Sequence, residues 1–377
     1  MENELLLCCA RTVVAPHVIA RLRELAAKNI DWEYLFLLAR RHAVVPLLYL
    51  QLNQHASDLA PNEQLQKLKQ HYLENSARNT VLTAELCRLI GLFADSGIEA
   101  IPYKGFVLSF FAYGDLGLRR FVDLDVIVKK SDVLKAREIL LAEGYAPTKS
   151  LSLSQQQLLL RTQHNMQFSR DNRQLIIELH WEVAPHLFAS SVGAEELWQN
   201  LITIDINGTS MKTLSADDLL FSLCVHGSRH LWERLNWICD VAALIRRHSF
   251  NWTTLLERST TADSERMFLL GLHLAHELLE APLPEEIERR CESDEQLKAL
   301  AENVVNHLFN GTTHVPATSR EIFNYNIRVR KTLGARARYL AHMFRPTDSD
   351  LNRRSLPSGM NFVYYLTRPF RLLRTKI

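Results

Sequence analysis

The sequence predicts an α+β fold in which a small mixed β-sheet core lies between N-terminal and C-terminal helical regions. Turn formers are scarce, with 13 Gly and 12 Pro among 377 residues, and 47% of the chain is hydrophobic, which favours a mainly helical globular protein. The hydrophobic period changes from helical to alternating after residue 97 and returns to helical after residue 214. We therefore expect an N-terminal helical region over 1–96, an α/β core over 97–214, a C-terminal helical domain over 215–345 and a basic, aromatic tail over 346–377.

The N-terminal region is predicted to consist of packed helices. Apolar residues recur at helical spacing over residues 1–60, and Asp31 stands where a helix N-cap is expected. A longer helix should run from about Pro61 to Asp95 and end at Gly97. Nothing in this region suggests chemistry, so we interpret it as structural.

The core begins as alternating strands and helices. Short strands are predicted for 98–103 and 121–128, with a helix over 105–113 between them. A second helix should be capped by Ser131 and stop at Gly144.

Two hairpins then complete the core, before helices resume. Their turns are expected at Asp171-Asn172 and Asn207-Gly208. The paired strands are 164–169 with 174–181 and 202–206 with 210–214. Ser215 and Asp218 have the spacing of a capping box, after which helices should continue to about Leu340.

Composition narrows the possible environments and partners. The net charge is only +2, but the chain from Arg328 onward holds twelve Lys or Arg against two Asp. An isoelectric point of about 8.2 makes nucleic-acid binding by this tail possible but not favoured, and packing on the acidic remainder or on an anionic membrane surface fits equally well. Six cysteines without CxxC pairs, an acidic N-terminus and no long apolar run predict a cytoplasmic protein with no transmembrane segment.

The strand FVDLDVIV carries the first chemical signal. Asp123 and Asp125 are two residues apart, so their side chains should project from one face of an otherwise apolar strand. Two carboxylates this close repel each other when buried, unless a cation such as Mg²⁺ neutralises them. The plainer alternative is an edge strand whose acids face water.

A second apolar strand, LIIELHW, places Glu178 and His180 on one face. Three acids on neighbouring strands could hold two metal ions that assist phosphoryl transfer. Taken alone, Glu178 is equally explained as a surface acid.

Several basic residues precede the acidic strand. In IPYKGF the chain passes from strand to helix through Lys104-Gly105, where unshielded backbone N–H groups and an ammonium could hold phosphate. Arg119 and Arg120 could do the same. The alternative is a plain turn followed by solvated charges.

A third motif, CVHGSRHLWERLNWICD, places His226 and His230 four residues apart on a helix, with Arg229 between them. Zinc binding is not favoured, because no third ligand is present in the segment. These residues could close a pocket over phosphates, or they could simply pack, with Asp240 pairing with Arg229 or His226.

Together these motifs resemble the nucleotidyltransferase superfamily with a DNA polymerase β-like core. The closest resemblance is to an uncharacterised bacterial nucleotidyltransferase family, over roughly residue 20 to the end. It is carried by KGFVLSFFAYGDLGLRRFVDLDVIVKKSDVLKAREILLAEGY, IELHWEV, LSADDLLFSLCVHGSRHLWERLNWICDVAAL and LTRPFRLLR. The fold this implies is a small mixed-sheet nucleotidyltransferase core.

The resemblance also implies residue roles. Asp123, Asp125 and Glu178 would be the catalytic residues and metal ligands. The resemblance places Gly105 at the turn that grips phosphate. From their charge and position in the sequence, we further predict as nucleotide-binding residues Lys104, Arg119, Arg120, His180, Arg229 and His230. Lys104 and Phe106 flank the glycine where the superfamily usually has Gly-Ser or Gly-Gly, and the gap from Gly105 to Asp123 is longer than usual.

The activity implied is transfer of a nucleoside monophosphate from an NTP to a hydroxyl-bearing acceptor, with release of pyrophosphate. Mg²⁺ would be the cofactor, as one or two ions, with Mn²⁺ as a substitute. A sugar, a small molecule, a peptide, a protein or an RNA end would serve as acceptor. Two alternatives stay open: a catalytically inactive member that binds a nucleotide or a partner, and an RNA-binding helical protein.

Overall fold

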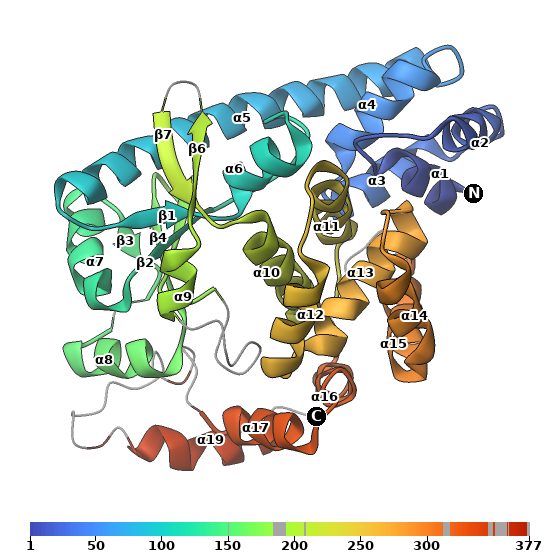
Figure 1. The fold of residues 1–377 in the computed structure, drawn as a ribbon. Helices are drawn as coiled ribbons and strands as arrows, with labels where there is room; N and C mark the ends of the chain where they lie inside the picture. Colours follow the sequence, from blue (N-terminus) through green and yellow to red (C-terminus); the bar gives the residue numbers. More distant parts are fainter. Residues whose placement is uncertain are drawn as a thin grey trace.

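The computed structural model describes residues 1–149, 151–183, 194–206, 209–311, 317–345, 350, 360 and 362–374. It confirms the predicted α+β class: a small mixed sheet is flanked by helices from both ends of the chain. Figure 1 shows the strands on one side of the molecule, helices α10 to α16 on the other, α17 and α19 along the bottom, and the long helix α5 along the top. Buried apolar residues from all these parts form one continuous core.

The N-terminal region is helical, as predicted. Its helices are α1 (Glu2–Cys9), α2 (Pro16–Ala26), α3 (Trp32–Arg41), α4 (Val45–His55) and α5 (Asn62–Asp95). Asp31 caps α3, because its side chain accepts a hydrogen bond from the Tyr34 N–H. The long helix is confirmed almost to the residue, and Gly97 follows it with φ of +70°, a conformation that favours glycine.

The main sheet has five strands in the order β1-β2-β5-β4-β3. Their bounds are β1 Ala100–Pro102, β2 Leu124–Val128, β3 Ala146–Pro147, β4 Asn165–Arg170 and β5 Leu175–His180. Strands β2 and β5 are parallel, while the other neighbours are antiparallel. All five residues of β2 are buried, so this strand lies inside the fold and is not a solvent-facing edge.

The helices of the core differ in detail from the prediction. The helix expected over 105–113 is split into α6 (Gly105–Leu108) and a π-helical turn, η1 (Ser109–Tyr113). The next helix, α7 (Val133–Ala142), is preceded by a 3₁₀ turn, η2 (Lys130–Asp132), so its N-cap is Asp132 and not Ser131. Helix α8 (Leu153–Thr162) follows β3.

Both hairpins form as antiparallel pairs. The β4–β5 turn is confirmed, with positive φ at Asp171 and Asn172, two residue types that tolerate it. Helix α9 (Ala194–Gln199) precedes the second hairpin, formed by β6 (Ile202–Ile206) and β7 (Thr209–Thr213). This hairpin is a separate two-stranded sheet, and its Asn207-Gly208 turn lies outside the described residues.

The C-terminal part is helical up to and including the tail. Its helices are α10 (Ala216–Arg229), α11 (Leu235–Arg247), α12 (Trp252–Thr261), α13 (Glu265–Leu279), α14 (Glu285–Ser293), α15 (Glu295–Leu308), α16 (Ser319–Arg328), α17 (Leu333–Met343) and α19 (Phe362–Arg374). Ser215 caps α10 as predicted, accepting a hydrogen bond from the Asp218 N–H at 3.1 Å. In the described part of the tail, Gln155 donates to the Tyr364 hydroxyl at 3.0 Å, which docks α19 on α8.

Two general properties follow from the described residues. None of the helices traced there is both long and apolar enough to cross a membrane. All six cysteines are free.

Packing around Trp232 gives a testable consequence. Its fully buried ring lies against Gly227, and a β-carbon at Gly227 would overlap that ring. We expect Gly227→Ala to lower the free energy of unfolding by about 1–3 kcal/mol, because overpacking a rigid core forces neighbours to shift. Gly91→Ala is the matched control: this site in α5 has open space, so the change should stabilise by about 0.5–1 kcal/mol. Urea unfolding of both variants tests this, and equal effects would contradict the packing described.

Candidate metal centre and nucleotide site

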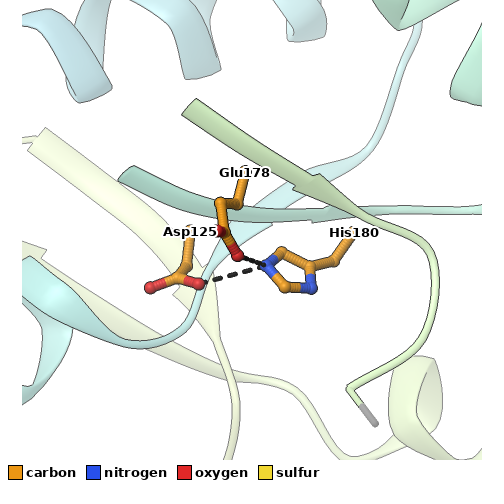
Figure 2. Close-up of side chains that lie close together, drawn as sticks. All are labelled: Asp125, Glu178 and His180. Carbon is orange, nitrogen blue, oxygen red and sulfur yellow. Dashed lines mark hydrogen bonds and ion pairs between the residues drawn. The ribbon is translucent and has the colours of Figure 1, made fainter. Parts of the chain in front are cut away.

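The parallel pairing of β2 with β5 builds the candidate site. In this register Asp125 lies directly beside Glu178, so the two side chains project from the same face of the sheet. His180, two residues further along β5, shares that face. Figure 2 shows the three side chains converging from the two strands.

The imidazole of His180 lies between the two carboxylates. Its Nε2 is 3.1 Å from Asp125 Oδ1 and 3.3 Å from Glu178 Oε2. One ligand atom from each of the three residues lies within 4.8 Å of the others, close enough to hold a single metal ion. Among the described residues, this is the one such group of acids, histidines and cysteines.

Neighbouring polar groups fix the orientation of this centre. In the β4–β5 register, Gln167 faces Glu178 and Asn165 faces His180. Asn165 Nδ2 donates to Glu178 Oε2 at 3.0 Å, and Gln167 Nε2 donates to Oε1 at 3.4 Å. The hydroxyl of the fully buried Tyr103 lies 3.3 Å from His180 Nδ1. Such outer contacts orient metal ligands, and the sequence analysis did not single out these three residues.

Lys104 supplies a cation inside the site. Its Nζ lies 3.4 Å from Asp125 Oδ1, on a side chain that is only 11% exposed. Burial alone would raise the pKa of Asp125, but the Lys104 ammonium and the hydrogen bond to His180 outweigh it and hold that pKa below its usual value. Burial would likewise raise the pKa of Glu178, but His180 lowers it below the ordinary value. Both carboxylates are therefore charged at neutral pH.

Asp123 stands just outside the strand in which the sequence placed it, because β2 begins at Leu124. It is half-buried, and it is absent from the tight group formed by Asp125, Glu178 and His180. Burial, together with the charges of Asp125 and Glu178, raises the pKa of Asp123 to about 6. Three carboxylates therefore share one electrostatic environment, with His180 closer to the centre than Asp123.

The Gly105 turn lies against the entrance to β2. Gly105 has φ of +39°, and a β-carbon there would meet the Asp123 carbonyl oxygen and the Phe121 ring at 3.4 Å. Both the backbone conformation and the close approach favour glycine. Within the described part of the chain, the N–H groups of Gly105 and Phe106 donate to no acceptor, although both residues are buried.

The two arginines predicted to contact phosphate lie in different settings. Arg119 is buried and donates through Nε and Nη2 to the two carboxylate oxygens of Asp240, at 2.8 and 2.9 Å. Tyr113 also donates to Asp240 at 2.8 Å, and Arg119 donates to the Gly105 carbonyl at 3.3 Å. Asp240 thus pairs with Arg119, and not with Arg229 or His226 as considered above. Arg120 is exposed.

His164 connects the last residue of α10, Arg229, with His180 of the candidate site. Arg229 donates to His164 Nε2 at 2.8 Å, and the His164 ring lies 5.9 Å from that of His180. The rings of His226 and His230 contact each other in a tilted arrangement, with centroids 4.6 Å apart and an angle of 53° between the planes. Burial and nearby cations lower the pKa of His226 and bring that of His230 to about 4, so both are neutral at pH 7. His164 was missed from sequence, although it directly precedes β4.

A carboxylate centre on a mixed sheet fits the nucleotidyltransferase class that the motifs of the sequence predicted. A family model described as "Uncharacterised nucleotidyltransferase" matches residues 28–280, which is more than half of the chain. The chain therefore belongs to this family, and the resemblance to an uncharacterised nucleotidyltransferase family is confirmed over these residues. No curated protein matches the sequence.

The buried ion pair behind the Gly105 turn gives a second prediction. Among the described residues, Arg119→Leu leaves the buried Asp240 carboxylate with only the Tyr113 hydroxyl as a partner, so we expect it to lower the free energy of unfolding by about 3–5 kcal/mol. The double variant Arg119→Leu with Asp240→Leu should lose less, because no unpaired charge remains. Urea unfolding measures both, and an equal or larger loss in the double variant would contradict this reasoning.

Proposed function

We propose that the protein is a nucleotidyltransferase that depends on a divalent metal ion. It transfers a nucleoside monophosphate from an NTP to an acceptor hydroxyl and releases pyrophosphate. The observation that carries this proposal is the pairing of Asp125 with Glu178 across β2 and β5, with His180 between their carboxylates. The family match supports the class of reaction, while the acceptor and the metal are our inference.

The donor set suits a divalent cation. Asp125 and Glu178 offer carboxylate oxygens, which Mg²⁺ and Mn²⁺ prefer, and His180 adds a nitrogen more favourable to Mn²⁺. Asp123 would add a third carboxylate from the entrance to the strand. When bound, such an ion neutralises phosphate charge and favours attack at the α-phosphorus.

Glu178 is suited to take the proton of the acceptor hydroxyl. It is charged at neutral pH, and the amides of Asn165 and Gln167 hold its carboxylate in place. Glu178 also borders a cavity of about 420 Å³ along β4 and β5, in which a small acceptor could lie. The acceptor hydroxyl would then face the same carboxylate that borders the metal centre.

The Gly105 turn is suited to hold phosphate oxygens. Among the described residues, the N–H groups of Gly105 and Phe106 have no acceptor, and a phosphate would supply one. Arg119 donates a hydrogen bond to the Gly105 carbonyl and so holds the turn in position. We therefore assign Arg119 a positioning role. Catalysis would come from positioning and from neutralised charge, without a covalent enzyme intermediate.

A second candidate is a catalytically silent member that binds a nucleotide or a partner. The Lys104 ammonium on Asp125 favours it, because an internal cation can replace a metal ion in neutralising the carboxylates. The absence of a hydroxyl-bearing residue after Gly105 points the same way.

The third prediction separates these two functions. Calorimetry of each NTP, with and without Mg²⁺ or Mn²⁺, should show binding that requires the ion. Pyrophosphate release with α-labelled NTP should fall on the order of a hundredfold or more in Asp125→Asn and in Glu178→Gln, because charge stabilisation of the transition state is lost.

Glu285→Gln is the matched control for this experiment, since this acid on α14 is 84% exposed. It should leave both readouts unchanged. Metal-independent NTP binding without pyrophosphate release would favour the silent member, and equal activity in Asp125→Asn would refute the transferase proposal.

The fourth prediction concerns pH. Because the pKa of Asp123 is raised to about 6, this carboxyl holds a proton at pH 5 that an arriving cation must displace. Mn²⁺ affinity should therefore rise from pH 5 to pH 7 and level off above it. In Asp123→Asn this part of the pH dependence should vanish. Mn²⁺ titrations followed by electron paramagnetic resonance test this, and an identical pH profile in Asp123→Asn would contradict it.

A further inference from the structure

Four arginines from four separate segments gather beside the entrance to β2. Arg40 lies on α3, Arg78 on α5, Arg120 just before β2, and Arg234 at the N-cap of α11. We call these four residues the arginine cluster. Arg40, Arg120 and Arg234 are exposed, and Arg78 is half-buried.

Hydrogen bonds place Arg78 against the segment that holds Arg120. Arg78 Nη1 donates to the Phe121 carbonyl at 2.7 Å, and Nη2 lies 3.3 Å from that of Val122. Phe121 directly follows Arg120, and Val122 directly precedes Asp123. Arg78 therefore holds the stretch of backbone that joins Arg120 to Asp123.

Helix packing brings Arg40 and Arg234, the other two members of the arginine cluster, towards Arg78 and Arg120. The rings of Phe36 on α3 and His71 on α5 lie 5.0 Å apart, which aligns the two helices. At the end of α3, His42 accepts hydrogen bonds from the N–H groups of Leu235 and Asn236 at the start of α11. Arg40 and Arg234 flank this junction.

The charges of the cluster are not compensated. Although much of Arg120 is exposed, partial desolvation of its guanidinium group and the charges of Arg78, Arg234 and Arg40 lower its pKa. Within the described part of the chain, no carboxylate forms an ion pair with any of the four.

We propose that the arginine cluster is a binding site for a short chain of phosphates. Guanidinium groups match phosphate oxygens in pairs, and four cations on separate elements suit several linked negative charges better than a single carboxylate. The phosphates have two possible sources: the triphosphate of the NTP, which rests on the proposed function, or a phosphorylated acceptor. In both cases the cluster would hold the anion next to Asp123.

The fifth prediction uses inorganic tripolyphosphate as the probe, without metal ions and at low salt. We expect calorimetry to detect binding to the wild type. Arg120→Gln and Arg234→Gln should each weaken it about tenfold, because each removes a charge-assisted contact. Arg40→Gln is an independent variant on another helix. Thermal melting verifies that the variants fold.

Arg289→Gln is the matched control, an arginine on α14 whose side chain is 68% exposed. It should bind like the wild type. Absence of binding to the wild type, or unchanged affinity in the cluster variants, would overturn the proposal.

Competition identifies the source of the phosphates. Displacement of tripolyphosphate by ATP but not by AMP supports the triphosphate of the NTP. Failure of ATP to displace it supports a phosphorylated acceptor. Asp125→Asn should still bind tripolyphosphate, so a failed transferase assay and a failed phosphate site remain distinguishable.

Discussion

The parallel pairing of β2 with β5 is the constraint on which the site depends. It places Asp125 and Glu178 side by side on one face of a buried sheet, where two negative charges repel each other. The fold tolerates this because His180 and Lys104 lie against the same carboxylates. The negative charges of Asp125 and Glu178 are thus compensated by Lys104 and His180. An added metal cation would share the carboxylate oxygens with these two side chains.

The helices contribute more than a scaffold. Arg119 donates hydrogen bonds both to the Asp240 carboxylate on α11 and to the Gly105 carbonyl. A C-terminal helix therefore helps to fix the position of the Gly105 turn. On the other side, Arg78 from the N-terminal helix α5 holds the backbone just before Asp123. Helices from both ends of the chain therefore help to set the geometry of the core that carries Asp125, Glu178 and His180.

Local sequence patterns correctly predicted the features that depend only on residues close together in the sequence. Alternation placed Glu178 and His180 on one face, and the cap at Asp31 followed from residue type alone. The sequence could not show which strand pairs with β2, so the nearness of His180 to Asp125 needed the structure. Nor could it reveal the partner of Arg119, because a contact across 121 residues leaves no local signal.

Lys104 connects these observations. A lysine before the glycine turn is a departure from the superfamily pattern, yet its ammonium compensates a carboxylate that would otherwise be buried beside another. Because the lysine side chain is long and flexible, the same ammonium could leave Asp125 for a phosphate once a cation replaces it, with no change in the backbone. An unusual residue at the turn is therefore compatible with a working centre: it would neutralise the carboxylates before the ligands arrive and contact phosphate afterwards.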